Sequence, residues 1–545
     1  MWAARLAYPV LALAGLAVLL RWRRPQWLLA GVLAAQAYAW GVTNYPLQRL
    51  YALGPSRDRI GNLGLVQVVA AGGSPLQTTQ VGQLHFEPFW GLLVAAVSGW
   101  EPERVLRLYP FLPLVMAVGF PLALYLGLRP LDKNADGWSA WERVLVAGFA
   151  ALLSSSALDY AGAYRVPWAR SFLLKPNHAL GLVIFPLFLG LFARIRSWRA
   201  RLLAGLVLQL LGWVFILHMV YVCCGLVAFA ALSALAARAE ARRDAVDVAA
   251  VIGINLVVVS PYIVMLLVGY PFLVRHPDYA LPAGSPHLVE GTLAAGALFW
   301  LGVWGAVVAY RRGDRLGRLW SAQLLGAFAV WVAYLGLGAI HLARERDEIF
   351  YWLRFLMAAS AAIGAWDLVK RLAPLMTPWL VAPAQRAAAV ALVAVPFSLP
   401  YWWDPARMDP NFAGSLTPLP ESLRASMEFL RRETDPRAVL AGDPVLTRWA
   451  AALGARRAVI VGGMNVTRDW EQRVRLVDLL VSSEDGAAVR AAAAPYGVRY
   501  LLVDPALLAH HSAVTLADLE RRPHLRRVHF SGDSEGDFVA IYRLD

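Results

Sequence analysis

Two acids near the N-terminus, Asp58 and Glu87, lie in segments that can form short helices along the membrane surface, outside the longest apolar runs. Asp58 is the second residue of the stretch RDRIGNLGLVQVVAAGGSP at 57–75, and Glu87 lies in LHFEPFW. Desolvation at a membrane boundary raises the pKa of a carboxyl group, which can make it a usable general base. The alternative is an ordinary charge, which at Asp58 would sit at a helix N-terminus between two arginines.

Composition sets the class of protein. Hydrophobic residues make up 59% of the chain and charged residues only 16%, against roughly 25% charged in a soluble domain. This predicts a polytopic α-helical membrane protein. The net charge of +14 comes from short arginine clusters without a nucleic-acid motif, so we expect no nucleic-acid partner. Cys223 and Cys224 are adjacent, which suits neither a metal site nor a disulfide framework.

Apolar stretches that cross or nearly cross a hydrocarbon core of about 30 Å predict about twelve transmembrane helices. We interpret the first as a retained helix, because its basic cluster follows the apolar core and no cleavage site is apparent. The count is open by one or two, since 202–237 can form one long helix or two, with a turn at His218. The stretches are 4–20, 27–42, 105–128, 143–158, 179–195, 202–218, 219–237, 247–269, 290–309, 317–340, 350–369 and 386–402.

Basic loops indicate the orientation in the membrane. We expect a cytoplasmic side formed by the arginine-rich segments at 21–26, 129–143, 194–201, 238–246, 310–318 and 370–386. With twelve spans, the loops at 43–104, 159–178, 270–289 and 341–349 and the tail then share the opposite face. We expect an integral protein of a bacterial plasma membrane and cell envelope, with a transmembrane domain at 1–403 and an extracytoplasmic domain at 404–545.

The tail after residue 403 has the charge spacing of a soluble domain. Helical stretches such as SLRASMEFLRRET alternate with β-rich runs such as AVLAG, VRYLLVD and FVAIYRL. This alternation predicts a small α/β domain. GGMN, after AVIVG, lacks the spacing of a dinucleotide-binding loop, so no nucleotide site is expected there.

The first outer loop, 43–104, carries a recognisable order of elements. An acid follows an early span, a short helix ends in AAGGSP, and LHFEPFW leads into GLLVAAVSGW. This order resembles the first loop of the glycosyltransferase C (GT-C) superfamily. The members of this superfamily are polytopic enzymes that use polyprenyl-phosphate-linked sugars. The resemblance implies a GT-C-like fold and places Asp58 at the position of the catalytic acid. It also implies an inverting transfer of sugar to an extracytoplasmic glycan, lipid or protein acceptor.

A leaving lipid phosphate needs cations, and arginine binds two phosphate oxygens at once. Three arginines are available in the segment HLARERDEIFYWLRF at 341–355. A second segment, KPNH at 175–178, combines a cation, an amide and an imidazole. The alternatives are an interfacial anchor for the first segment and helix capping with snorkelling for the second. The candidate substrate-binding residues are Lys175, Asn177, His178, Arg344, Arg346 and Arg354, with His218 at a presumed outer turn.

His218 can instead satisfy itself against a helix backbone. No cluster of His, Asp and Glu has metal-ligand spacing, so a divalent metal is not indicated, and the only cofactor-like molecule we expect is the polyprenyl-phosphate sugar donor. Two other functions stay open. One is a transporter or flippase for a lipid-linked or small polar substrate, for which the sequence lacks a convincing internal repeat. The other is a non-catalytic assembly protein.

Overall fold

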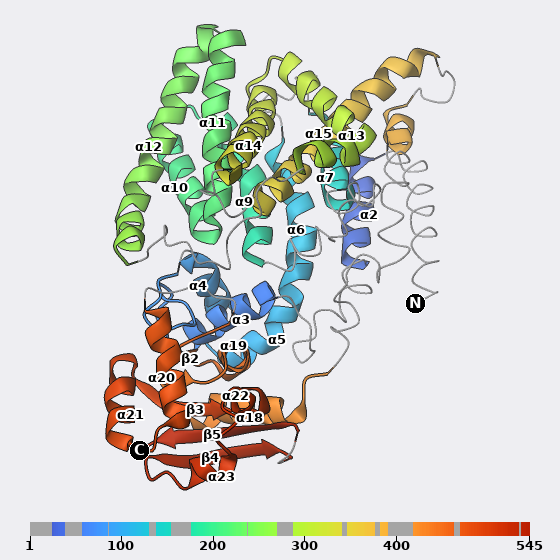
Figure 1. The fold of residues 1–545 in the computed structure, drawn as a ribbon. Coiled ribbons are helices and arrows are strands. Elements are labelled where there is room, and N and C mark those ends of the chain that lie inside the picture. Colours follow the sequence, from blue (N-terminus) through green and yellow to red (C-terminus); the bar gives the residue numbers. More distant parts are fainter. Residues whose placement is uncertain are drawn as a thin grey trace. The chain divides into compact units, whose positions relative to one another are not determined.

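The computed structural model describes most of the chain (Figure 1), and the chain divides into two compact units. The first, here called the helical unit, comprises Met1–Pro46, Leu112–Pro261 and Arg275–Phe412. The second, the mixed unit, comprises Leu47–Phe111, Tyr262–Val274 and Ala413–Asp545, so the first loop clusters with the tail. The domain boundary at residue 404 stays a prediction. The described residues are 24–38, 57–85, 87–129, 138–153, 176–236, 238–269, 287–339, 346–375, 382–390, 418–462, 469–533 and 536–545.

Long helices form the helical unit, and glycines let them approach closely. An ideal Cβ at Gly305 would lie 1.8 Å from the Ser360 carbonyl oxygen, and one at Gly326 would lie 2.5 Å from the Gly225 nitrogen. Backbones therefore touch where α13 meets α15 and where α14 meets α11. The helices are α2 (Pro25–Tyr38), α6 (Leu112–Gly127), α7 (Ala140–Leu153), α9 (Pro176–Ala193), α10 (Trp198–Val214), α11 (Ile216–Ala236), α12 (Arg238–Gly269), α13 (His287–Arg311), α14 (Arg315–Ala339) and α15 (Arg346–Leu372).

Within the described residues, three helices are long and apolar enough to cross a membrane, or four if one bent pair counts as a single span. They cover Ile216–Leu235, Ala239–Val264 and Arg315–Ala333. The expected number of twelve is therefore not confirmed. The helical character of this part of the chain agrees with the expectation for a polytopic protein.

Residues 202–236 of the predicted stretch 202–237 form parts of two helices. Phe215 adopts an extended conformation (φ −157°, ψ 106°), and it separates α10 from α11. Arg201, near the start of α10, and Ser233, near the end of α11, both contact acids one turn apart on α12. The two helices therefore run in opposite directions, and the break falls at Phe215, just before His218.

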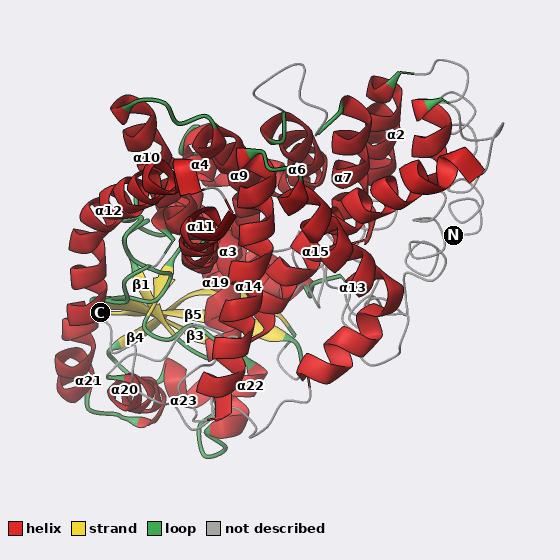
Figure 2. Cartoon of the chain, turned by 90° about the horizontal axis from the view of Figure 1, so that it is seen from above, coloured by secondary structure: helices red, strands yellow, loops and turns green. Residues whose placement is uncertain are grey.

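Among the described residues, a five-stranded sheet forms the core of the mixed unit (Figure 2). The strand order is β2-β1-β3-β5-β4, in which β1 is parallel to β2 and β3, and β5 is antiparallel to β3 and β4. The prediction that the C-terminal part of the chain forms a small α/β domain is therefore confirmed. The strands are β1 (Val439–Ala441), β2 (Arg457–Ala458), β3 (Val498–Val503), β4 (Leu525–Gly532) and β5 (Phe538–Leu544). The helices of the tail are α18 (Glu421–Glu433), α19 (Pro444–Gly454), α20 (Trp470–Ser482), α21 (Gly486–Ala493), α22 (Pro505–His510) and α23 (Leu516–Glu520).

In the part of the first loop that the structure describes, three helices belong to the mixed unit: α3 (Arg57–Ala70), α4 (Pro88–Val97) and α5 (Pro102–Leu108). α3 is buried on several faces, as the consecutive residues Val66, Gln67 and Val68 are each at most 4% exposed. It packs mainly against α19 of the tail and α4 of its own loop. It is therefore a core helix of the mixed unit, although its sequence suggested a helix along a membrane surface.

Candidate functional site

The predicted catalytic acids both lie at helix starts in the mixed unit. Asp58 is in the first turn of α3, where the helix dipole favours a negative charge. Its side chain lies outside the described part of the chain, so its catalytic role stays a prediction. Glu87 is the half-buried N-cap residue of α4, but its side chain makes no capping hydrogen bond with the helix.

His85, two residues before Glu87, is buried within the same loop. Burial lowers the pKa of its imidazole from 6.5 to about 4, although a hydrogen bond with the Pro75 backbone acts in the opposite direction. The ring is therefore neutral at pH 7. Sequence reasoning did not single out His85, because its burial depends on tertiary packing.

Buried polar side chains hold the first loop in shape. The Gln67 amide nitrogen donates to the Pro102 carbonyl at 3.0 Å and so joins α3 to the start of α5. The Thr78 hydroxyl donates to the Gln83 side-chain oxygen at 2.8 Å inside the turn region. These bonds fix the segment between α3 and α5, which contains Glu87.

The helical unit brings together three of the predicted binding segments. Ring centroids of His178, at the start of α9, and His218, at the start of α11, lie 5.6 Å apart. The His218 ring lies 4.6 Å from that of Trp352 on α15, and Gly181 makes room for it, since a Cβ there would lie 2.3 Å from the His218 Nδ1 atom. The starts of α9 and α11 therefore meet the early part of α15.

The other predicted binding residues are described less completely. Asn177 is buried in the first turn of α9, beside His178. Arg346 is the first residue of α15 and Arg354 lies two turns further along, but only their backbones are described. Lys175 and Arg344 lie outside the described residues. The proposed contacts of all these residues with substrate stay predictions.

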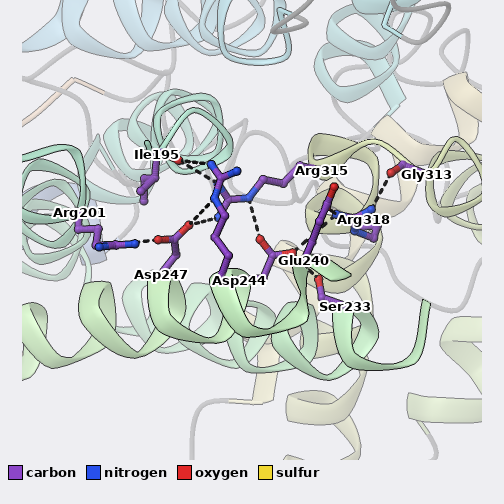
Figure 3. A network of polar contacts seen from close by, with 10 residues as sticks. Ile195, Arg201, Ser233, Glu240, Asp244, Asp247, Gly313, Arg315 and Arg318 are labelled. Atoms are coloured by element: carbon purple, nitrogen blue, oxygen red, sulfur yellow. Dashed lines mark hydrogen bonds and ion pairs between the residues drawn. The ribbon is translucent and has the colours of Figure 1, made fainter. Parts of the chain in front are cut away.

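Two buried acids on α12, Asp244 and Asp247, organise a second polar cluster in the helical unit (Figure 3). An Asp247 oxygen lies 2.7 Å from the Arg201 Nε atom, and an Asp244 oxygen lies 3.1 Å from the Arg315 Nε atom. Asp247 also pairs with Arg315, and Asp244 lies 3.6 Å from Arg318. The network ties the starts of α10, α12 and α14 together, in segments that the sequence had marked only as topology signals.

Within the described ranges, no three His, Cys, Asp or Glu side chains gather in a way that could hold a metal ion. The expectation about metals stays a prediction.

No family model matches the sequence, and no curated protein matches it either. Solved structures do share its fold. The ArnT protein of Cupriavidus metallidurans, bound to undecaprenyl phosphate, aligns with a TM-score of 0.52 and 12% identity, over 94% of this chain and 97% of its own. The apo oligosaccharyltransferase of Archaeoglobus fulgidus aligns with a TM-score of 0.51 and 15% identity, over 87% of this chain and 69% of its own.

A third similar structure is the mycobacterial arabinofuranosyltransferase AftD, with a TM-score of 0.51 and 19% identity. The alignment covers 96% of this chain but 40% of that longer protein. All three are GT-C glycosyltransferases. The resemblance to the GT-C superfamily inferred from the first loop is therefore confirmed for the fold, over both units of the chain.

Proposed function

We propose that the protein is an integral membrane glycosyltransferase of the GT-C type, which moves a sugar from a polyprenyl-phosphate donor to an extracytoplasmic acceptor. The observation that carries this proposal is the shared fold with ArnT, which extends over 94% of this chain and 97% of that one. The ArnT structure holds undecaprenyl phosphate, a lipid of the donor class expected from the first loop. The candidate acid Asp58 belongs to the first turn of helix α3 in that loop.

In the proposed reaction, Asp58 is the general base and Glu87 is the second candidate. The carboxylate takes the proton of an acceptor hydroxyl while that oxygen attacks the anomeric carbon of the sugar. The bond between the anomeric carbon and the lipid-phosphate oxygen breaks, and the polyprenyl phosphate leaves from the opposite face of the ring. The transfer therefore inverts the anomeric configuration.

Binding of the donor phosphate requires positive charge and N–H donors. Guanidinium groups suit this purpose, and neutral imidazoles and amides add hydrogen-bond donors. We assign this role to Lys175, Asn177, His178, His218, Arg344, Arg346 and Arg354. The meeting of His178, His218 and Trp352 supports the assignment for the segments at the starts of α9, α11 and α15.

The proposal includes the membrane arrangement expected from the basic loops. About twelve helices cross a bacterial plasma membrane, and the α/β domain of the tail lies outside the cytoplasm. The acceptor is a glycan, lipid or protein of the cell envelope, and no divalent metal is indicated for the reaction.

The direct experiment is a transfer assay with the full chain purified in detergent. Undecaprenyl phosphate carrying a radiolabelled pentose or hexose is the donor, and candidate envelope glycans, lipids and peptides are offered as acceptors. The proposal predicts a labelled covalent product and free undecaprenyl phosphate. Movement of intact donor across reconstituted vesicles without such a product would favour transport and would contradict the proposal.

A further inference from the structure

Helix α3, which begins with Arg57 and Asp58, lies against helix α19 of the C-terminal α/β domain. The contact depends on a glycine. An ideal Cβ at Gly64 would lie 3.2 Å from the Ala451 Cβ atom and 3.1 Å from a Thr79 methyl group. These distances are tighter than about nine in ten real Cβ contacts, so a branched side chain at position 64 would push α3 away from α19.

The segment that follows α3 adds to the edge of the sheet at β2. The Ala458 amide donates to the Thr79 carbonyl at 3.0 Å, and the Val81 amide donates to the Ala458 carbonyl at 3.0 Å. Between them, the buried Gln80 side-chain oxygen accepts from the Val461 amide at 3.1 Å. Main-chain pairing of this kind fixes the register of the loop against the sheet.

A third anchor lies at α5. Glu103 forms an ion pair with Arg431 of α18 at 2.8 Å, and Arg431 also donates to the Leu453 carbonyl at the end of α19 at 2.6 Å. The first loop is therefore held by α19, by β2 and by α18, at three places separated along its own sequence. Three separate anchors fix both the position and the direction of α3.

We infer that the C-terminal α/β domain acts as the positioning device for the catalytic loop, with Gly64, Gln80 and Glu103 as positioning residues for Asp58. This inference rests on the proposed function, because it takes Asp58 as the general base. It assigns the tail a role in catalysis that does not require it to touch substrate. Displacement of a reacting group by about 1 Å lowers a rate by on the order of 10²-fold. Small changes at these anchors should therefore lower the rate of sugar transfer.

The test compares the wild type with Gly64→Val, and with Gly64→Val combined with Ala451→Gly, which removes the Cβ at 3.2 Å. Gly253→Val is the matched control, because a Cβ at Gly253 of α12 meets nothing within 4 Å. Each protein is measured by hydrogen exchange of the 57–70 amides and by steady-state sugar transfer. Gly64→Val is expected to speed exchange and to lower kcat by at least about tenfold with the donor KM within about twofold. The double variant should recover part of both values, because the Thr79 methyl group at 3.1 Å still limits the space beside position 64.

Glu103→Ala gives a second, milder variant in case Gly64→Val does not fold, because the Glu103 side chain is 43% exposed. It should lower kcat in the same way, with a smaller change in exchange. Faster exchange at 57–70 with unchanged kcat, in either variant, would overturn the inference. Unchanged exchange in Gly64→Val would overturn it as well. A wild type that transfers no sugar would remove the proposed function, whereas the exchange comparison would still decide whether the α/β domain holds α3.

Discussion

A Glu103 carboxylate oxygen lies 2.8 Å from the Nε atom of Arg431, although 328 positions separate these residues in the chain. Desolvation alone would raise the pKa of Glu103, but the hydrogen bond and charge of Arg431 and the charge of Arg432 together hold it below its usual value. The pair joins the first loop to the tail. The loss of this ion pair should therefore weaken the packing of the first loop against the tail.

Glu103→Gln should weaken this docking modestly, because the carboxylate is partly exposed and exposed ion pairs contribute up to about 1 kcal/mol. The folded-state pKa of Glu103 is lowered, so the wild-type contribution is present above the usual value of 4.5 and is lost as the pH falls through the lowered pKa. Hydrogen exchange of the 102–108 amides, followed against pH and salt, measures the effect. Equal protection in wild type and variant at neutral pH and low salt would contradict the prediction.

The lowered pKa of His85 predicts that the stability of the first loop also depends on pH. Its pKa is about 4 in the folded protein against 6.5 ordinarily, so between these values the unfolded chain binds more protons than the folded one. Stability of the loop should therefore fall as the pH decreases from 6.5 to about 4, by at most roughly 3 kcal/mol. Hydrogen exchange at 57–85, corrected for the intrinsic pH effect, measures this change. His85→Gln should show a flatter profile in the same window, and an identical slope would exclude His85 as its source.

The network on α12 predicts a large stability effect. The Asp247 carboxylate is fully buried and pairs with Arg201 and Arg315, so Asp247→Asn removes the charge that neutralises them. The expected loss is about 3 kcal/mol or more in the free energy of unfolding. Glu240→Gln is the matched control, because Glu240 is 55% exposed, and it should cost less than about 1 kcal/mol. Unfolding in detergent measures the free energy of unfolding of both variants. Equal losses in the two variants would contradict a stabilising role for the buried Asp247 ion pairs.

Arg354 tests the proposed phosphate contacts. Arg354→Ala should weaken use of the lipid donor by roughly 1.5 to 3 kcal/mol, seen as a higher donor KM, because a charge-assisted contact is lost. Arg354→Lys should rescue it only in part, since lysine lacks the planar fork. Arg424→Ala, at a half-exposed position on α18, serves as the control. An unchanged donor KM in Arg354→Ala would favour the alternative, in which the 341–355 segment is only an interfacial anchor.

Sequence reasoning succeeded where local pattern decides structure. The strands β1, β3 and β5 lie in apolar runs, and α18 carries an amphipathic pattern, so each was expected from its own residues. β4 was missed, because LRRVHFSG is polar on its exposed face and is ordered by pairing with β5. The alternation of apolar and polar residues was too weak there to indicate a strand.

Long-range packing explains the other differences. The local sequence of α3 suggested a surface helix, but its burial comes from α19, hundreds of residues later in the chain. Asp244, in a predicted basic segment, and Asp247, at the start of the next predicted span, were passed over, although their spacing of three residues places both on one face of a helix. That spacing was the available signal for the network. His178 and His218 were identified, but only the structure brings their rings to 5.6 Å.

The central claim is that Asp58 acts as the general base, and Asp58→Asn tests it most directly. Asparagine keeps the size of the side chain and serves helix starts about as well, but it cannot accept the proton. We therefore expect sugar transfer from a polyprenyl-phosphate donor to fall by roughly 10²-fold or more, with little change in thermal stability. Glu471→Gln, at an 85% exposed side chain, should keep full activity. An Asp58→Asn protein with a near-normal rate would contradict the account, and loss of activity in Glu87→Gln alone would move the role of base to Glu87.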